Sequence, residues 1–98
     1  YMLKARRYHI CGQVQDVGFR NFAQEIALRE GLQGFVANCS DGSVEAEVEG
    51  EDTSIERFER AIRVGPPGAN VESVNVDERP PSGRAVGFSI TPGNTWNL

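Results

Sequence analysis

The chain has 98 residues, with 10 Lys and Arg against 14 Asp and Glu and a net charge of -4 at pH 7. This length allows one modest hydrophobic core without a disulfide or metal, so we expect a single domain over residues 1–98, with its core from about residue 5 to 91 and a tail at 92–98. The basic residues are scattered, which argues against binding of nucleic acid, and no apolar run approaches a membrane span. We expect a cytoplasmic protein.

Apolar spacing predicts the first strand and the first helix. Tyr8 and Ile10 alternate with polar residues, which indicates a strand over about residues 5–12 with one buried face. Apolar residues then recur at helical spacing as Phe19, Phe22, Ala23, Ile26 and Ala27. Gly31 supplies a stop for this helix.

The middle of the chain predicts a hairpin and a second helix. Two β-prone runs, residues 33–39 and 43–49, are joined through an Asp-Gly step at Asp41 and Gly42, which is a strong hairpin signal. The sequence Thr-Ser-Ile-Glu at residues 53–56 is typical of a capping box that opens a helix. The apolar stripe of that helix is Ile55, Phe58, Ala61 and Ile62. The Gly-Pro-Pro-Gly sequence at residues 65–68 ends it.

Two further strands complete the predicted fold. Valines at positions 71, 74 and 76 indicate a fourth strand, and Val86, Phe88 and Ile90 indicate a short final one after a turn at residues 80–83. The order β-α-β-β-α-β plus a fifth strand is the split βαβ sandwich of the ferredoxin-like α+β folds, with an antiparallel sheet and both helices on one face. The tail is expected to be loosely held, with Trp96 and Leu98 able to dock.

The two cysteines are expected to be free thiols. Cys11 and Cys39 have no close cysteine partner and only His9 nearby as a nitrogen ligand, so a zinc site lacks its ligands. In the predicted fold their strands flank a third strand and lie about 9 to 10 Å apart. The alternative to free thiols is a disulfide between them, but that separation exceeds the reach of an unstrained disulfide.

Residues 12–20 combine features that suit an oxyanion. A predicted strand runs into a glycine-punctuated loop, and Arg20 stands at the start of the following helix, where backbone amides also point outward. A guanidinium stays protonated and can bind two phosphate oxygens at once. Asn38 lies near the end of the second strand. Because the strands joined by the first helix are parallel in this fold, Asn38 and Arg20 can face one another across one cleft.

At these residues the chain resembles the acylphosphatase family. The family signature Gly-x-Val-Gln-Gly-Val-x-Phe-Arg is met by Gly12, Val14, Gln15, Val17, Phe19 and Arg20, and it fails only at Asp16. A second signature, Gly-aromatic-x-x-Asn-x-x-x-Gly-x-Val with a later Gly, is met by Gly34, Phe35, Asn38, Gly42, Val44 and Gly50. The resemblance extends from about residue 7 to 90.

The resemblance implies hydrolysis of the carboxyl-phosphate anhydride of small acyl phosphates, with no metal and no cofactor. Inorganic phosphate or sulfate is then the expected product or inhibitor, and we expect a monomer. Carried over residue by residue, Arg20 would hold the phosphate and Asn38 would orient the attacking water. The phosphate-binding loop, acting through its backbone amides, would be Gly12, Gln13, Val14, Gln15, Asp16, Val17, Gly18 and Phe19.

Each site residue also has a structural interpretation. Arg20 could pair with Glu25 or Asp16, and Asn38 could simply terminate a strand. Taken together at this spacing, the residues favour a site. His9 is expected to be solvent-exposed, and the alternating glutamates at positions 45, 47 and 49 are interpreted as the solvated face of a strand.

Two other classes of function compete. A regulatory domain that binds an acyl phosphate or phosphate without hydrolysing it would keep the loop and Arg20. Asp16 favours this alternative, because it places a negative charge where the family has glycine; the position also requires a positive φ, which Asp tolerates. An RNA-binding module of similar fold would need paired aromatic and basic residues on its central strands, which here carry Tyr8 and a row of glutamates.

Overall fold

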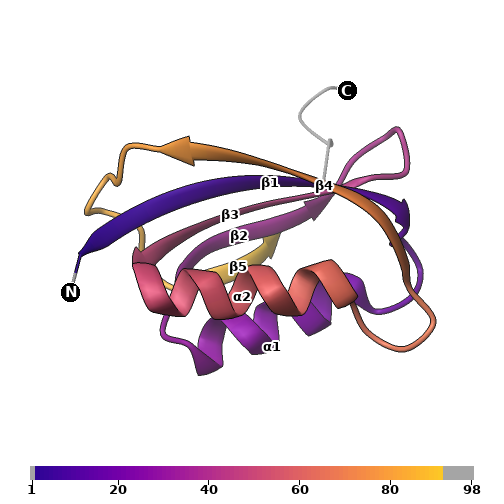
Figure 1. The fold of residues 1–98 in the computed structure, drawn as a ribbon, viewed down its shortest axis with the longest axis horizontal. Helices are drawn as coiled ribbons and strands as arrows, with labels where there is room; N and C mark the ends of the chain where they lie inside the picture. The colour runs from indigo at the N-terminus through magenta and orange to yellow at the C-terminus, as the bar shows by residue number, and fades with distance from the viewer. Residues whose placement is uncertain (1, 92–98) are drawn as a thin grey trace.

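The computed structural model describes residues 2–91 as a five-stranded sheet with two helices packed on one face (Figure 1). The elements along the chain are β1 (Leu3–Gln13), α1 (Phe19–Arg29), β2 (Gln33–Asn38), β3 (Val44–Glu51), α2 (Asp52–Val64), β4 (Asn70–Arg79) and β5 (Phe88–Thr91). The strand order across the sheet is β4-β1-β3-β2-β5. The predicted ferredoxin-like α+β fold is confirmed. The predictions about the tail lie outside the described residues.

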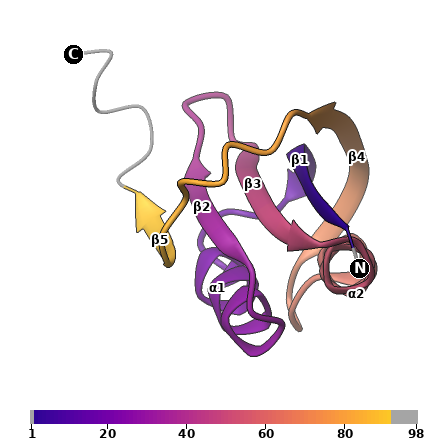
Figure 2. The same ribbon diagram turned by 90° about the vertical axis from the view of Figure 1, so that its left-hand side faces the viewer.

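The core lies between the sheet and the two helices. Alternation along β1 turns Tyr8 and Ile10 toward the helices, and both side chains are fully buried. Helix α1 covers β2 and β5, whereas α2 covers β4, β1 and β3 (Figure 2). The helices contribute Phe19, Ala23, Ile26, Ala27, Ile55, Phe58 and Ile62 to this core. The predicted apolar stripes therefore face the sheet, although Ala61 and Phe22 are only partly buried.

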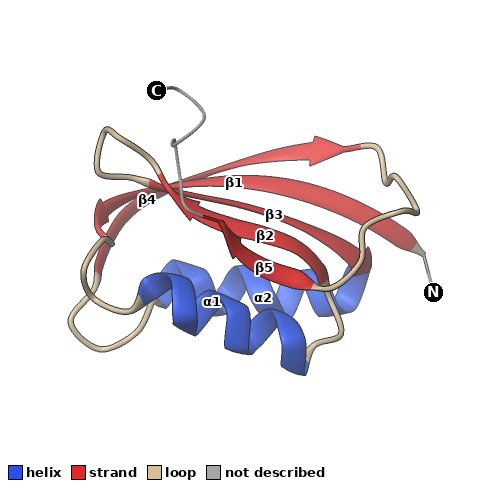
Figure 3. Ribbon diagram, turned by 180° about the vertical axis from the view of Figure 1, so that it is seen from behind, coloured by secondary structure: helices blue, strands red, loops and turns tan. Residues whose placement is uncertain are grey.

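Strand β3 is inserted between β1 and β2, as the split βαβ plan predicts. It pairs antiparallel with both neighbours, and in each pairing Val44 lies at the end near the loops: opposite Ile10 of β1 and opposite Asn38 of β2. Strands β1 and β2 therefore run in the same direction, and their carboxyl ends lie at the same end of the sheet (Figure 3). Helix α1 begins at this same end of the sheet, shortly after β1.

The prediction of an entirely antiparallel sheet is wrong at one edge, because β5 pairs parallel with β2. Pairing begins with Phe88 opposite Gly34, and the Gly34 amide donates to the Gly87 carbonyl at 2.9 Å. Val86, predicted as part of this strand, is 92% exposed and lies outside it. The chain after β4 crosses the end of the sheet to reach the far edge, and this crossover has no local sequence signal.

The capping box predicted for α2 is also wrong. The helix begins at Asp52, so Glu51 is the N-cap residue and its side chain caps no backbone amide. Thr53 already lies in the first turn, and its hydroxyl donates to the Glu51 carboxylate at 2.8 Å. Strand β3 runs two residues further than predicted, which moves the helix start forward.

The glutamates of β3 are paired, which corrects their interpretation as a solvated face. Arg7 of β1 lies between Glu45 and Glu47, at 2.6 and 3.2 Å from their carboxylates. Glu49 is only 9% exposed. The backbone amides of Ser82 and the glycine after it donate to Glu49 at 2.9 and 2.7 Å. These bonds, with the Ser82 amide contributing most, lower the pKa of Glu49, and they fasten the crossing segment to the sheet.

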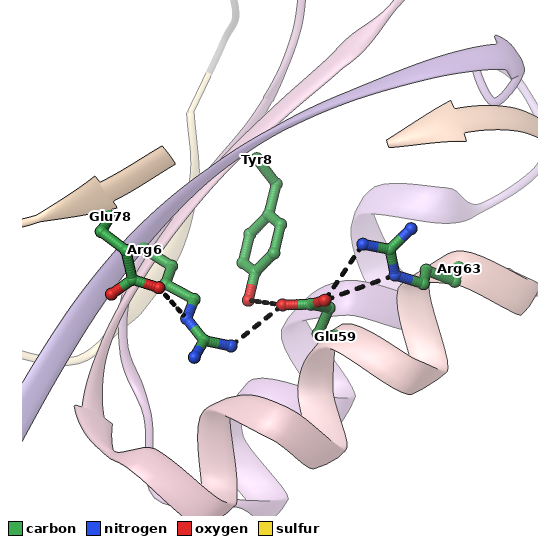
Figure 4. Close-up of polar contacts among 5 residues, drawn as sticks. All are labelled: Arg6, Tyr8, Glu59, Arg63 and Glu78. Carbon is green, nitrogen blue, oxygen red and sulfur yellow. Dashed lines mark hydrogen bonds and ion pairs between the residues drawn. The ribbon is translucent and has the colours of Figure 1, made fainter. Parts of the chain in front are cut away.

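A polar network connects the sheet to α2 (Figure 4). The Tyr8 hydroxyl and the Arg6 guanidinium both donate to one oxygen of Glu59 in α2, at 3.1 and 3.0 Å. Arg63 pairs with the other Glu59 oxygen at 3.0 Å, and Arg6 also reaches Glu78 of β4 at 2.6 Å. Burial raises the pKa of Tyr8, so its hydroxyl remains a donor. Three elements are thus held together on the helix side of the sheet.

Candidate active site

The loop between β1 and α1 turns back on itself through left-handed backbone positions. Gly12 has a φ of 127° at an irregularity in the β1–β4 pairing, where any Cβ would collide with the Asn70 carbonyl. Asp16 and Gly18 have φ values of 62° and 77°. The positive φ predicted for Asp16 is confirmed, and Gly18 is the N-cap residue of α1.

A pocket of about 260 Å³ lies where this loop, the first turn of α1 and the end of β2 meet. Its lining residues are Val14, Asp16, Gly18, Phe19, Arg20, Asn21, Asn38 and Ile90. Arg20 and Asn38 thus lie in the same pocket although they are 18 positions apart in the chain. Four predicted loop residues, Gly12, Gln13, Gln15 and Val17, are outside the lining.

Arg20 is half-buried, and its guanidinium has no hydrogen-bond or ion-pair partner within residues 2–91. The alternative pairing with Glu25 or Asp16 is therefore not formed. Arg20 lines the pocket from the first turn of α1, where the backbone amides also favour negative charge, so this part of the pocket is attractive to an anion.

Asn38 is the last residue of β2, and strand alternation turns it to the same face as Val36, which packs in the core. Its Oδ1 atom is buried and accepts no hydrogen bond from any residue between 2 and 91. Buried polar atoms are nearly always hydrogen-bonded, so an unpartnered oxygen on a residue that lines a pocket is a candidate acceptor for a donor from outside the chain.

Two pocket residues were not predicted from the sequence. Asn21 directly follows Arg20, and a polar residue in the first turn of a helix was the signal available for it. No sequence signal was available for Ile90 of β5, because it reaches the pocket only through the crossing of the chain to the far edge of the sheet. Gln15 was predicted to act through its backbone, but its side chain is hydrogen-bonded to the β2–β3 turn.

His9 lies outside the pocket, and its side chain is partly exposed, in line with the prediction. Its side chain is 43% exposed, and its Nε2 atom lies 2.7 Å from the Ser43 hydroxyl. Cys11 and Cys39 are free thiols, as predicted. Within residues 2–91, no three His, Cys, Asp or Glu side chains gather where a metal ion could be held. No helix in that range is both long and apolar enough to cross a membrane.

Comparison with known proteins places the chain among hydrolases of ferredoxin-like fold. Residues 6–90 match the family model for acylphosphatase. The chain is 46% identical over 90 residues to the acylphosphatase of Azoarcus sp., which covers 92% of this chain and 91% of that protein. It is 45% identical over 87 residues to the acylphosphatase of Rubrobacter xylanophilus, covering 89% and 79%. The chain belongs to the acylphosphatase family and is an enzyme.

A solved structure agrees with this assignment. The crystal structure of acylphosphatase from Bacillus subtilis superposes with a TM-score of 0.87 at 37% identity, covering 92% of this chain and 99% of that one. The resemblance read from the two signatures is therefore confirmed at the level of family and fold.

Proposed function

We propose that the protein hydrolyses the carboxyl-phosphate anhydride bond of small acyl phosphates to a carboxylate and inorganic phosphate, with no metal and no cofactor. One observation carries this proposal: Arg20, whose guanidinium has no partner within residues 2–91, and Asn38, whose buried Oδ1 atom has none there either, line one pocket. At about 260 Å³ the pocket is slightly smaller than the sites of about 300 to 1,000 Å³ that hold drug-sized ligands, which suits a small substrate.

Arg20 and the loop amides hold the phosphate in this proposal. Phosphoryl transfer leaves a protein little covalent work, so positioning and charge stabilisation dominate. The guanidinium binds two phosphate oxygens, and amides between Gln13 and Phe19, including those at the start of α1, donate to the phosphate. The left-handed positions at Asp16 and Gly18 turn the loop so that its amides can converge.

Asn38 orients the attacking water. Its Oδ1 accepts a hydrogen bond from the water, whose oxygen attacks phosphorus in line with the acyl oxygen. The bond from phosphorus to the acyl oxygen breaks, the carboxylate leaves with the electron pair, and the proton of the water passes to a phosphate oxygen. A carboxylate is a good leaving group, so this reaction does not require a strong general base.

Hydrolysis of benzoyl phosphate with and without EDTA tests the proposal. We expect turnover that EDTA does not reduce, because the groups that position phosphate and water belong to the chain. Activity that is abolished by EDTA and restored by a divalent metal would contradict the metal-free mechanism. Phosphate binding without turnover would support the second candidate, a non-hydrolysing acyl-phosphate or phosphate-binding domain, which the carboxylate of Asp16 in the pocket favours.

Inorganic phosphate is expected to bind the pocket and inhibit competitively. A ligand at a hundredfold excess over its dissociation constant stabilises the folded state by about 2.7 kcal/mol, so thermal unfolding should shift upward measurably. The Arg20→Ala variant should lose this shift. Thermal unfolding and titration calorimetry measure both effects, and an equal shift in wild type and Arg20→Ala would rule out the guanidinium as the phosphate ligand.

Removing the charge of Asp16 is expected to raise catalytic efficiency. The side chain is exposed, lines the pocket and has no hydrogen-bond or ion-pair partner within residues 2–91. A carboxylate about 5 Å from the bound phosphate, in a largely aqueous environment, reduces kcat/KM about fourfold, and more at low ionic strength.

Asp16→Asn tests the charge alone, because asparagine also tolerates the φ of 62°. Asp16→Gly restores the family residue. We expect both variants to exceed wild type in steady-state kinetics at low salt. Three equal efficiencies would mean that the carboxylate does not sense the substrate.

A further inference from the structure

The side chain of Gln15 connects the two segments that carry Arg20 and Asn38. Gln15 is a half-buried residue of the loop between β1 and α1, and it does not line the pocket. Its Nε2 atom donates to the backbone carbonyl of Cys39 at 2.7 Å and to that of Ser43 at 2.9 Å. Both carbonyls belong to the turn between β2 and β3, and the first is in the residue directly after Asn38.

The β2–β3 turn closes through its own hydrogen bonds. The Cys39 amide donates to the Ser43 carbonyl at 2.8 Å, and the Gly42 amide donates to the Cys39 carbonyl at 3.2 Å. The Asp41 carboxylate accepts from the Ser43 amide at 3.0 Å and from the Ser43 hydroxyl at 2.5 Å. A carbonyl oxygen has two lone pairs, so the Gln15 amide adds a second bond to each. Its contribution is therefore the connection between turn and loop.

We propose that Gln15 is a positioning residue: by holding the β2–β3 turn against the β1–α1 loop, it sets the distance from Arg20 to Asn38. This inference rests on the proposed function, in which Arg20 holds the phosphate and Asn38 holds the water. In-line attack requires the two to be placed accurately, and a displacement of about 1 Å can lower the rate about a hundredfold.

The two side chains do not fix this distance themselves. Neither the Arg20 guanidinium nor Asn38 Oδ1 has a hydrogen-bond partner within residues 2–91. Their relative position therefore follows from the backbone segments that carry them. These segments are the start of α1, which follows the loop after β1, and the end of β2. Strands β1 and β2 are separated by β3, and Gln15 connects the loop directly to the turn that follows β2.

Gln15→Ala tests the proposal, since it removes both bonds and leaves the chemical identity of Arg20, Asn38 and every loop amide unchanged. We expect kcat for benzoyl phosphate to fall about tenfold to a hundredfold, while the inhibition constant of inorganic phosphate changes by less than about threefold. Gln33→Ala is the matched control, because this exposed glutamine begins β2 and its side chain has no partner within residues 2–91. Equal kcat values for the two variants, or phosphate inhibition lost in proportion to kcat, overturn the proposal.

Gln15→Glu separates positioning from damage to the fold. An ionised carboxylate facing two carbonyl oxygens is repelled, whereas the protonated acid can donate to one of them. Both effects raise the pKa of the introduced acid above the ordinary value of about 4.3. The kcat of Gln15→Glu relative to wild type should therefore rise as the pH falls from about 7 to about 4.5. The same ratio for Gln15→Ala should stay flat. A flat ratio for Gln15→Glu overturns the proposal, even where Gln15→Ala does not fold.

Failure of the proposed function gives a different result. A wild-type protein that binds inorganic phosphate without hydrolysing benzoyl phosphate overturns the proposed function and the positioning role together. A wild-type protein that hydrolyses benzoyl phosphate, with Gln15→Ala unimpaired, overturns the positioning role alone.

Discussion

Replacing Arg20 with alanine is expected to reduce kcat/KM for benzoyl phosphate by about a thousandfold or more, the range found when a phosphate-binding arginine is removed from a phosphoryl-transfer site. The guanidinium has no other partner within residues 2–91, so its charge is available to the substrate. Its loss should lower the affinity for phosphate and the stabilisation of the transition state. Steady-state kinetics and phosphate inhibition measure the two effects separately.

Arg20→Lys should remain impaired in both measurements, because an ammonium group cannot reproduce the planar fork of donors. Arg29→Ala is the matched control, since Arg29 is an exposed arginine in the last turn of the same helix. We expect Arg29→Ala to behave as wild type. If Arg20→Ala retains wild-type efficiency while its thermal unfolding is unchanged, the phosphate is bound elsewhere.

Replacing Asn38 with alanine is expected to lower kcat by about a hundredfold to a thousandfold, the effect of removing one well-placed polar group from a transition state. The inhibition constant of inorganic phosphate should stay close to that of wild type. The reason is that water placement contributes to the transition state and not to binding of the ground state. The buried Oδ1 atom without a partner in the described chain is the observation behind this expectation.

Asn75→Ala is the control for this variant, because Asn75 is an exposed asparagine on β4. Circular dichroism and thermal unfolding establish that Asn38→Ala keeps its fold. Under that condition, a loss of phosphate inhibition equal to the loss of kcat would place Asn38 among the phosphate ligands and would contradict its assignment to the water.

The fold was predictable from the sequence wherever one side of an element is buried. Alternation at Tyr8 and Ile10, and the helical spacing of Phe58 and Ile62, are imposed by contact with one core, so the pattern is visible locally. The start of α2 was not predictable, because Thr53 and Glu56 meet the capping pattern while β3 extends to Glu51. The parallel pairing of β5 depends on a crossing segment fastened by Glu49, a contact between residues more than 30 positions apart.

The site was predictable to the extent that it is contiguous in the chain. The glycine-punctuated loop ending in Arg20 lies within nine residues, and the predicted fold brought the end of β2 to the same edge. Ile90 and the side-chain role of Gln15 were not predictable, because each depends on a tertiary contact that leaves no periodicity in the sequence. Asn21 required only the recognition that the first turn of α1 faces the pocket.

The insertion of β3 between β1 and β2 makes assembly of the candidate site depend on the completion of folding. Arg20 follows β1 and Asn38 ends β2, yet these strands do not pair with each other. Their separation depends on β3, which pairs with β2 as a hairpin and with β1 across more than 30 positions of the chain, and such non-local pairing is the slow part of forming a sheet. A nascent or partly refolded chain therefore has both residues but no assembled pocket. Recovery of hydrolysis during refolding consequently reports when β3 has paired in the sheet, whereas a spectroscopic signal of helix formation would not report it.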